Sequence, residues 1–147
     1  MRTTTLNLLL ADDDPDDCTL FEEALDDLSL NANLRIVNDG VQLMSFLVSG
    51  VEDLPDVLFL DLNMPVKSGF DCLSEIKSTD KLKDLPVIIF STSLDMEVVN
   101  LLYEKGAHYY IRKPGKYSKL KKVISDALSL VENNIMQPPR VQFVLNT

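Results

Sequence analysis

Three aspartates in this sequence could do metal or phosphoryl chemistry if the fold brought them together. Asp12 and Asp13 directly follow the apolar run Leu8–Ala11, and Asp61 directly follows the apolar run Val57–Leu60. Three carboxylates at one place repel one another, and a hard divalent cation relieves that repulsion. Mg²⁺ suits a site that has few protein oxygens and keeps several waters. A carboxylate beside such a cation can accept a phosphoryl group and form an acyl phosphate.

A lysine and a hydroxyl group would complete such a site. Lys113 follows a later apolar run and could offset charge on transferring phosphoryl oxygens, while the hydroxyl of Ser91 could hydrogen-bond them. Each residue alone has a plainer explanation. Asp14 before Pro15 is typical of a helix N-cap, and a single lysine is usually a surface residue. The functional interpretation therefore depends on the whole set.

Short apolar runs alternate with helical patterns along the chain, and this alternation predicts how the set is positioned. Five strand–helix units predict an α/β fold, a doubly wound, five-stranded parallel sheet with five helices on both faces. Ligands bind such sheets beyond the carboxyl ends of the strands, where all the residues above lie. The predicted strands are Leu6–Ala11, Leu34–Asn38, Asp56–Asp61, Pro86–Ser91 and His108–Ile111.

Composition narrows the function classes. The chain has 147 residues, of which 46% are hydrophobic and 25% charged, as expected for one globular domain. No apolar run is long enough to span a membrane, and we expect a cytoplasmic protein. The net charge of −9 comes from residues 12–27, which hold nine acidic residues and no basic one. This acidity makes DNA an improbable partner.

Together these motifs resemble the receiver domain of bacterial two-component response regulators. The matching segments are residues 8–17, 56–69, 86–93 and 106–114. They occur in the order and at the spacing of that family, and the resemblance covers residues 5–131. It implies a flavodoxin-like fold with strand order 2-1-3-4-5.

The resemblance also implies roles for individual residues. Asp61 would be the phosphoacceptor, with Mg²⁺, or Mn²⁺ in its place, bound by Asp12, Asp13, Asp61 and the backbone carbonyl of Asn63. Ser91 and Thr92 would bind the phosphoryl group, and Lys113 would neutralise it. Tyr110 would be the switch aromatic that turns inward when Ser91 is drawn to the phosphoryl oxygens. The family often has a cis peptide bond where Lys113 precedes Pro114 here.

The resemblance further implies a signalling role in a phosphorelay. A histidine kinase or histidine phosphotransfer protein would donate to Asp61, and the only reactions would be self-phosphorylation and self-dephosphorylation. A downstream protein would bind the region Asp95–Val131, and a homodimer is a further option. The alternative is a Mg²⁺-dependent phosphohydrolase with an aspartate nucleophile, although such enzymes carry Asp-x-Asp after the first strand. A nucleotide-binding module is disfavoured, because the sequence has none of the glycine-rich motifs that bind nucleotide phosphates.

Residues 132–147 form a C-terminal tail in this interpretation, with no output domain. Pro138 and Pro139 break any helix that continues from Val131. Three apolar side chains in the tail would be unfavourable if they were exposed. We therefore expect Gln142–Leu145 to dock on its own domain or on a second chain.

Overall fold

The sheet of this computed structural model is wholly parallel, and its strands begin and end close to the predicted positions. The structure describes residues 5–50, 53–134 and 136–145. The strand order is β2-β1-β3-β4-β5-β6. Successive strands are therefore added on one side of β1 first, as β2, and then on its other side, beginning with β3. The strands are β1 (Leu6–Ala11), β2 (Ala32–Val37), β3 (Val57–Leu60), β4 (Val87–Ser91), β5 (Tyr109–Arg112) and β6 (Val144–Leu145).

Five α-helices connect the strands, and short polar side chains begin four of them. Asp14, Asp39, Ser68 and Asp95 each accept a backbone N–H of the first helical turn, which satisfies donors that the helix leaves unpaired. Asp14 was the predicted cap of the first helix. The helices are α1 (Pro15–Asp27), α2 (Gly40–Ser49), α3 (Gly69–Ser78), α4 (Met96–Glu104) and α5 (Tyr117–Asn133).

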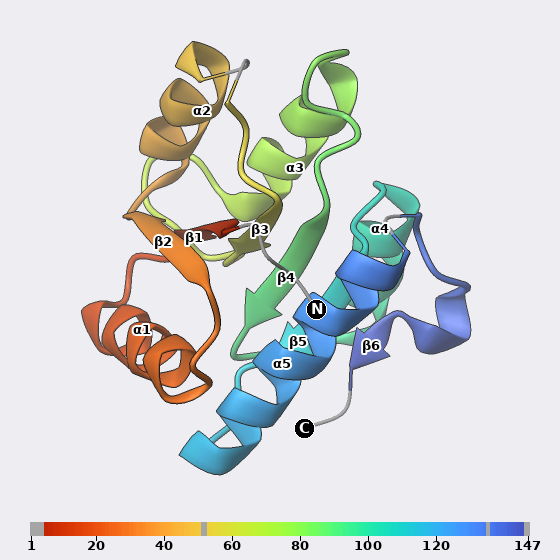
Figure 1. Cartoon of the computed structure of the whole chain (residues 1–147). Helices are drawn as coiled ribbons and strands as arrows, with labels where there is room; N and C mark the ends of the chain where they lie inside the picture. The colour runs from red at the N-terminus through yellow and green to blue at the C-terminus, as the bar shows by residue number, and fades with distance from the viewer. Residues whose placement is uncertain (1–4, 51–52, 135, 146–147) are drawn as a thin grey trace.

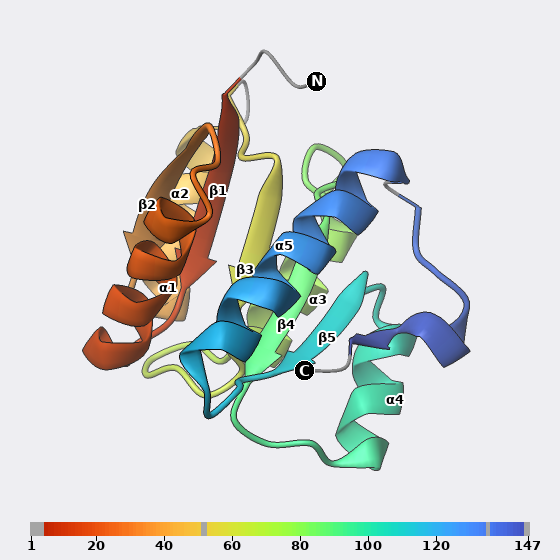
Figure 2. The same cartoon turned by 60° about the horizontal axis from the view of Figure 1, so that its bottom comes forward.

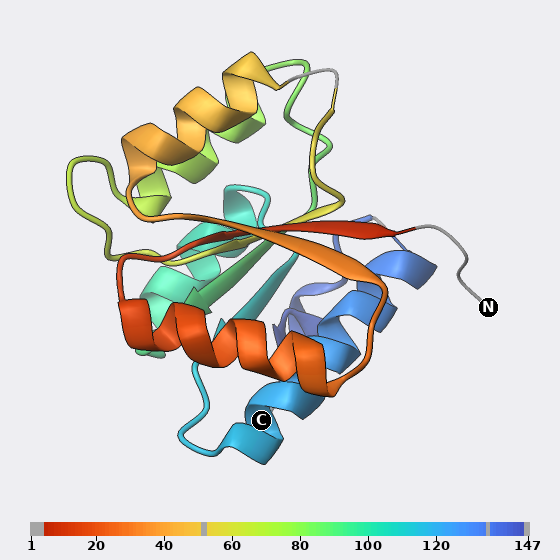
Figure 3. The ribbon, with the colours of Figure 1, turned by 60° about the vertical axis from the view of Figure 1, so that its left-hand side comes forward.

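The helices cover both faces of the sheet. In Figure 3, α1 and α5 lie on one side of the sheet and α2 and α3 on the other. The core divides accordingly, because α1 and α5 pack on one face and α2, α3 and α4 on the opposite face. The strands β3 and β4 are buried along their whole length, as expected for strands covered on both faces. The flavodoxin-like arrangement is confirmed.

The C-terminal tail corrects the predicted strand count from five to six. The tail leaves α5, forms a short 3₁₀ turn (Arg140–Gln142) and then pairs with β5 as β6 (Figure 2). Phe143 is fully buried, and its ring meets the ring of Tyr103 from α4 at a centroid distance of 5.1 Å. The Tyr103 hydroxyl donates to the carbonyl of Pro138 at 2.7 Å. The tail therefore docks on its own domain, one of the two expected outcomes (Figure 1).

Among the described residues, no helix is both long enough and apolar enough to cross a membrane.

Candidate functional site

Backbone hydrogen bonds align the predicted site residues at the carboxyl edge of the sheet. The N–H of Asp12 donates to Val37, that of Asp61 donates to Ala11, and that of Lys113 donates to Ser91. Each bond extends the pairing of two neighbouring strands by one residue. The side chains that follow β1, β3 and β5 therefore start from one edge, and those after β1 and β3 flank the point where the strand order reverses. Open parallel sheets bind ligands at this position.

The carboxylates of Asp12, Asp13 and Asp61 form a cluster that fits a divalent cation. One oxygen from each lies within 4.8 Å of one from each of the others. The side chain of Asp12 is fully buried, and its Oδ2 is partnered by the ammonium of Lys113, 2.8 Å away. Three carboxylates gathered so closely are natural ligands for a hard cation, and carboxylates suit Mg²⁺ or Mn²⁺. The structure thus brings together the three aspartates expected from the sequence.

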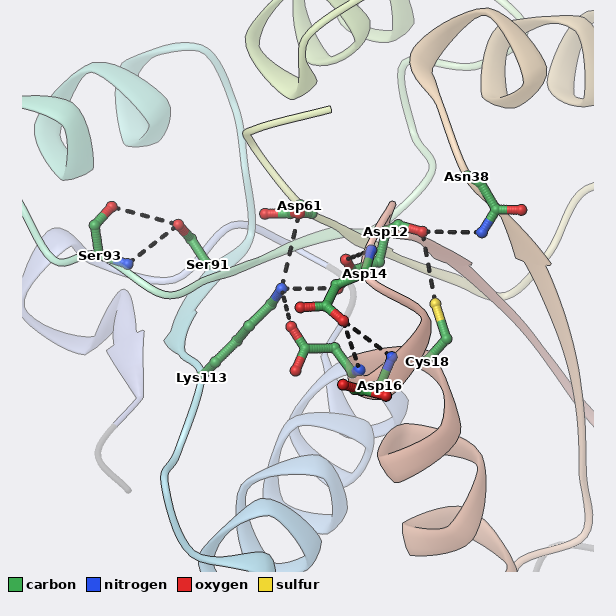
Figure 4. Close-up of polar contacts among 10 residues, drawn as sticks. Asp12, Asp14, Asp16, Cys18, Asn38, Asp61, Ser91, Ser93 and Lys113 are labelled. Atoms are coloured by element: carbon green, nitrogen blue, oxygen red, sulfur yellow. Dashed lines mark hydrogen bonds and ion pairs between the residues drawn. The ribbon is translucent and has the colours of Figure 1, made fainter. Parts of the chain in front are cut away.

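Lys113 is the positive charge of the cluster. Its Nζ lies 2.8 Å from Asp12 Oδ2 and 3.7 Å from Asp61 Oδ2 (Figure 4). The same Nζ lies over the ring of Phe90, 5.4 Å from the ring centroid. Burial by itself would lower the pKa of Lys113, but hydrogen bonds to Asp12 and Asp17 outweigh burial and raise it. The side chain is therefore held as an ammonium beside the carboxylates.

The carboxyl group of Asp61 has a raised pKa. Burial raises the pKa of Asp61 to about 6, against the attraction of Lys113, and the neighbouring charge of Asp12 adds to the rise. A backbone hydrogen bond from Asn63 acts in the opposite direction. A nearby cation would favour the charged form and lower this pKa. At neutral pH the carboxylate is ionised and able to act as a nucleophile.

Ser91 is the last residue of β4, and the loop after it carries Thr92 and Ser93. The buried Ser91 hydroxyl lies 3.4 Å from both the backbone nitrogen and the hydroxyl of Ser93 (Figure 4). Thr92 is exposed in the same loop. Tyr110 is fully buried, and its hydroxyl donates to the carbonyl of Ser93 at 2.5 Å. The Tyr110 side chain is thus buried in this structure, with its hydroxyl bonded to the loop that follows Ser91.

The segment after β3 packs closely against the backbone of Asp61, the candidate acceptor. A Cβ placed on Gly69 would lie 2.3 Å from the carbonyl oxygen of Asp61. Val66, at the tip of this loop, has φ of 69° and is 83% exposed. The N–H of Lys67 donates to the carbonyl of Pro65 across it, which makes a γ-turn of the rare, strained kind. The tight turn returns the chain from Asp61 to α3.

Two features depart from the sequence-based expectations. No described residue has a cis peptide bond, so Lys113–Pro114 is trans, the isomer that X–Pro bonds favour by about 0.5–1 kcal/mol. Asp17, which we did not single out, has its Oδ2 2.8 Å from Lys113 Nζ. Its place as the third residue of α1 was a signal, because the first turn of α1 starts at the same edge of the sheet.

Comparison with known proteins identifies the family whose sequence and fold this chain shares. Residues 8–125 match the family model described as the response regulator receiver domain. The response regulator Rcp1 of Synechocystis sp. is 33% identical over 121 residues, which cover 80% of this chain and 82% of Rcp1.

Solved structures of similar regulators share the fold. The phosphorylated cyanobacterial phytochrome response regulator RcpA superimposes with a TM-score of 0.82 at 28% identity, covering 92% of this chain and all of RcpA. The Mn²⁺-bound form of Rcp1 superimposes with a TM-score of 0.78 at 30% identity, covering 91% of this chain and 99% of Rcp1.

Proposed function

Because this chain belongs to the response regulator receiver domain family, we propose that its signal is a phosphoryl group carried on Asp61. The observation that carries the proposal is the joint position of three carboxylates within 4.8 Å and of Lys113 beside them. The acceptor oxygen of Asp61 would attack the phosphorus of a phosphohistidine. The P–O bond forms as the P–N bond breaks, and the imidazole leaves.

The residues around Asp61 have distinct tasks in this reaction. Asp12, Asp13 and Asp61 would hold Mg²⁺, with the backbone carbonyl of Asn63 as a further ligand. The cation would supply positive charge against the phosphoryl oxygens. The ammonium of Lys113 would donate a hydrogen bond to one of these oxygens, and the hydroxyls of Ser91 and Thr92 would donate to others. Loss of the phosphoryl group would be self-catalysed hydrolysis.

The proposed partners follow from this chemistry. The donor would be a histidine kinase or a histidine phosphotransfer protein in the cytoplasm. RcpA is named a phytochrome response regulator, so a phytochrome-type kinase is the first donor to test. The receiving protein, or a second copy of the chain, would bind the face formed by Asp95–Val131. Tyr110 donates to the carbonyl of Ser93, and the Ser93 hydroxyl lies 3.4 Å from that of Ser91. A movement of Ser91 toward a phosphoryl group on Asp61 would therefore reach this face.

Mapping of the acyl phosphate tests the proposal. The protein is incubated with acetyl phosphate and Mg²⁺, and the labelled residue is identified by mass spectrometry. Asp61→Asn removes the nucleophile and keeps the shape, so we expect no labelling while the circular dichroism spectrum stays that of the folded protein. Asp13→Asn and Lys113→Ala should each slow labelling by about tenfold or more. Labelling that persists in Asp61→Asn, or in excess chelator, would contradict the proposal.

A further inference from the structure

Asp17 is an acidic residue that the proposed reaction does not use. It lies in the first turn of α1, and its Oδ2 is as close to Lys113 Nζ as Asp12 Oδ2 is, at 2.8 Å in both cases. Asp17 is 26% exposed, whereas the side chain of Lys113 is 10% exposed. Figure 4 shows the amine of Lys113 pointing between Asp61 and the start of α1. The ammonium is thus shared between the acceptor and the helix.

We propose that Asp17 is a positioning residue that holds Lys113 on the α1 side of the site and competes with the phosphoryl group for its ammonium. This inference rests on the proposed function, since it assumes that a phosphoryl group arrives on Asp61. It concerns how strongly the phosphorylated state is stabilised and how long it lasts.

The distances around Lys113 indicate the competition. The two close carboxylates, Asp12 and Asp17, leave Asp61 as the distant partner at 3.7 Å. When Asp12 turns to a cation, Asp17 remains as the carboxylate that neutralises the ammonium. A phosphoryl group on Asp61 must then draw Lys113 away from Asp17. That ion pair is only partly exposed, so water screens it less than a pair on the open surface.

A second explanation must be separated from this one. Removing any acidic residue near the site lowers the general repulsion of an anion, without involving Lys113. Asp16 provides the matched control, because it lies in the same helical turn, carries the same charge and is exposed. Among the described residues, the ion pairs of Lys113 are with Asp12, Asp17 and Asp61. Asp16→Asn therefore measures the loss of general repulsion alone. Asp17→Asn measures that loss together with the release of Lys113.

Binding of beryllofluoride, a mimic of the phosphoryl group on an aspartate, tests the inference at saturating Mg²⁺. We expect Asp17→Asn to bind it about fivefold more tightly than the unmodified protein, and Asp16→Asn to differ by less than about twofold. In a Lys113→Ala background, Asp17→Asn should have no effect beyond that of Asp16→Asn, because Asp17 acts through Lys113. Asp17→Glu, which keeps the charge, should restore weaker binding.

A crystal structure of Asp17→Asn without metal gives a readout that needs no ligand. Lys113 Nζ should then lie within hydrogen-bond distance of Asp61. The inference is overturned if Asp17→Asn binds beryllofluoride no more tightly, if Asp16→Asn gains equally, or if the gain over Asp16→Asn persists without Lys113. Failure of the unmodified protein to bind beryllofluoride would contradict the proposed function instead. In that case the distance between Lys113 and Asp61 in the variant still decides the present inference.

Discussion

At the scale of the residue, the most informative group is the buried carboxylate of Asp61. Its pKa is raised from 3.8 to about 6 because the carboxyl is taken out of water. An acid whose pKa is higher in the folded protein than in the unfolded chain takes up a proton on folding. Ionised Asp61 therefore lowers the free energy of unfolding above about pH 6, and this penalty is absent below pH 3.8.

Asp61→Asn should consequently be more stable than the unmodified protein at pH 7.5 in the presence of a chelator. We expect a gain on the order of 2 kcal/mol in the free energy of unfolding, shrinking as the pH falls from 6 towards 4. Thermal unfolding across this pH range measures it. Saturating Mg²⁺ provides the control, because a bound cation stabilises the ionised carboxylate and should remove the gain. Equal stability of the two proteins at every pH would show that Asp61 is not desolvated.

At the scale of the element, the joint between β3 and α3 constrains the acceptor. A Cβ on Gly69 would lie 2.3 Å from the carbonyl oxygen of Asp61 and 2.8 Å from the Cα of Leu62. Both are backbone atoms, so the strand end itself would have to shift. We expect Gly69→Ala to lower the free energy of unfolding by about 2 kcal/mol and to slow labelling of Asp61.

Gly115→Ala is the matched control for this prediction. No atom lies within 4 Å of a Cβ placed at Gly115, and the residue is exposed. We expect its stability to change by less than about 0.5 kcal/mol and its labelling rate to stay the same. Denaturant unfolding and acetyl phosphate labelling measure both quantities. If the two variants behaved alike, close packing at Gly69 would not be what holds Asp61 in place.

At the scale of the whole molecule, the C-terminal tail is part of the domain. Phe143 packs against Tyr103 and Tyr110, with ring centroids 5.1 Å and 6.3 Å away, and its carbonyl accepts the N–H of Tyr110. Phe143→Ala should lower the free energy of unfolding by about 3 kcal/mol, because it leaves a cavity between α4 and β5. Removing residues 134–147 should lower the melting temperature further, since it also uncovers the edge of β5.

Val141→Ala is the control for the tail, because Val141 is 89% exposed and its loss should change stability by less than about 0.5 kcal/mol. Calorimetry of the three variants measures these effects. A Phe143→Ala protein as stable as Val141→Ala would mean that tail docking does not stabilise the domain.

Local patterns were sufficient to predict much of this protein. Apolar runs such as Val57–Leu60 identified buried strands, and Asp14 identified the start of α1, because burial and helix capping depend on neighbouring residues. The alternation of strands and helices then predicted that residues following the strands share one edge. For this reason Asp12, Asp13 and Asp61 could be grouped from the sequence before any distance was known.

Contacts between distant segments were decided only by the tertiary structure. The pairing of Asp17 with Lys113 joins residues 96 positions apart, and β6 joins the tail to β5. Two-residue strands carry no readable periodicity, and the buried place of Phe143 exists only once α4 and β5 have formed the surface beneath it. The sequence by itself determined which side chains meet at the carboxyl edge, because strand ends align in any parallel sheet. Which partner Lys113 pairs with, where Tyr110 lies and where the tail docks depend on side-chain packing between elements, which no local pattern encodes.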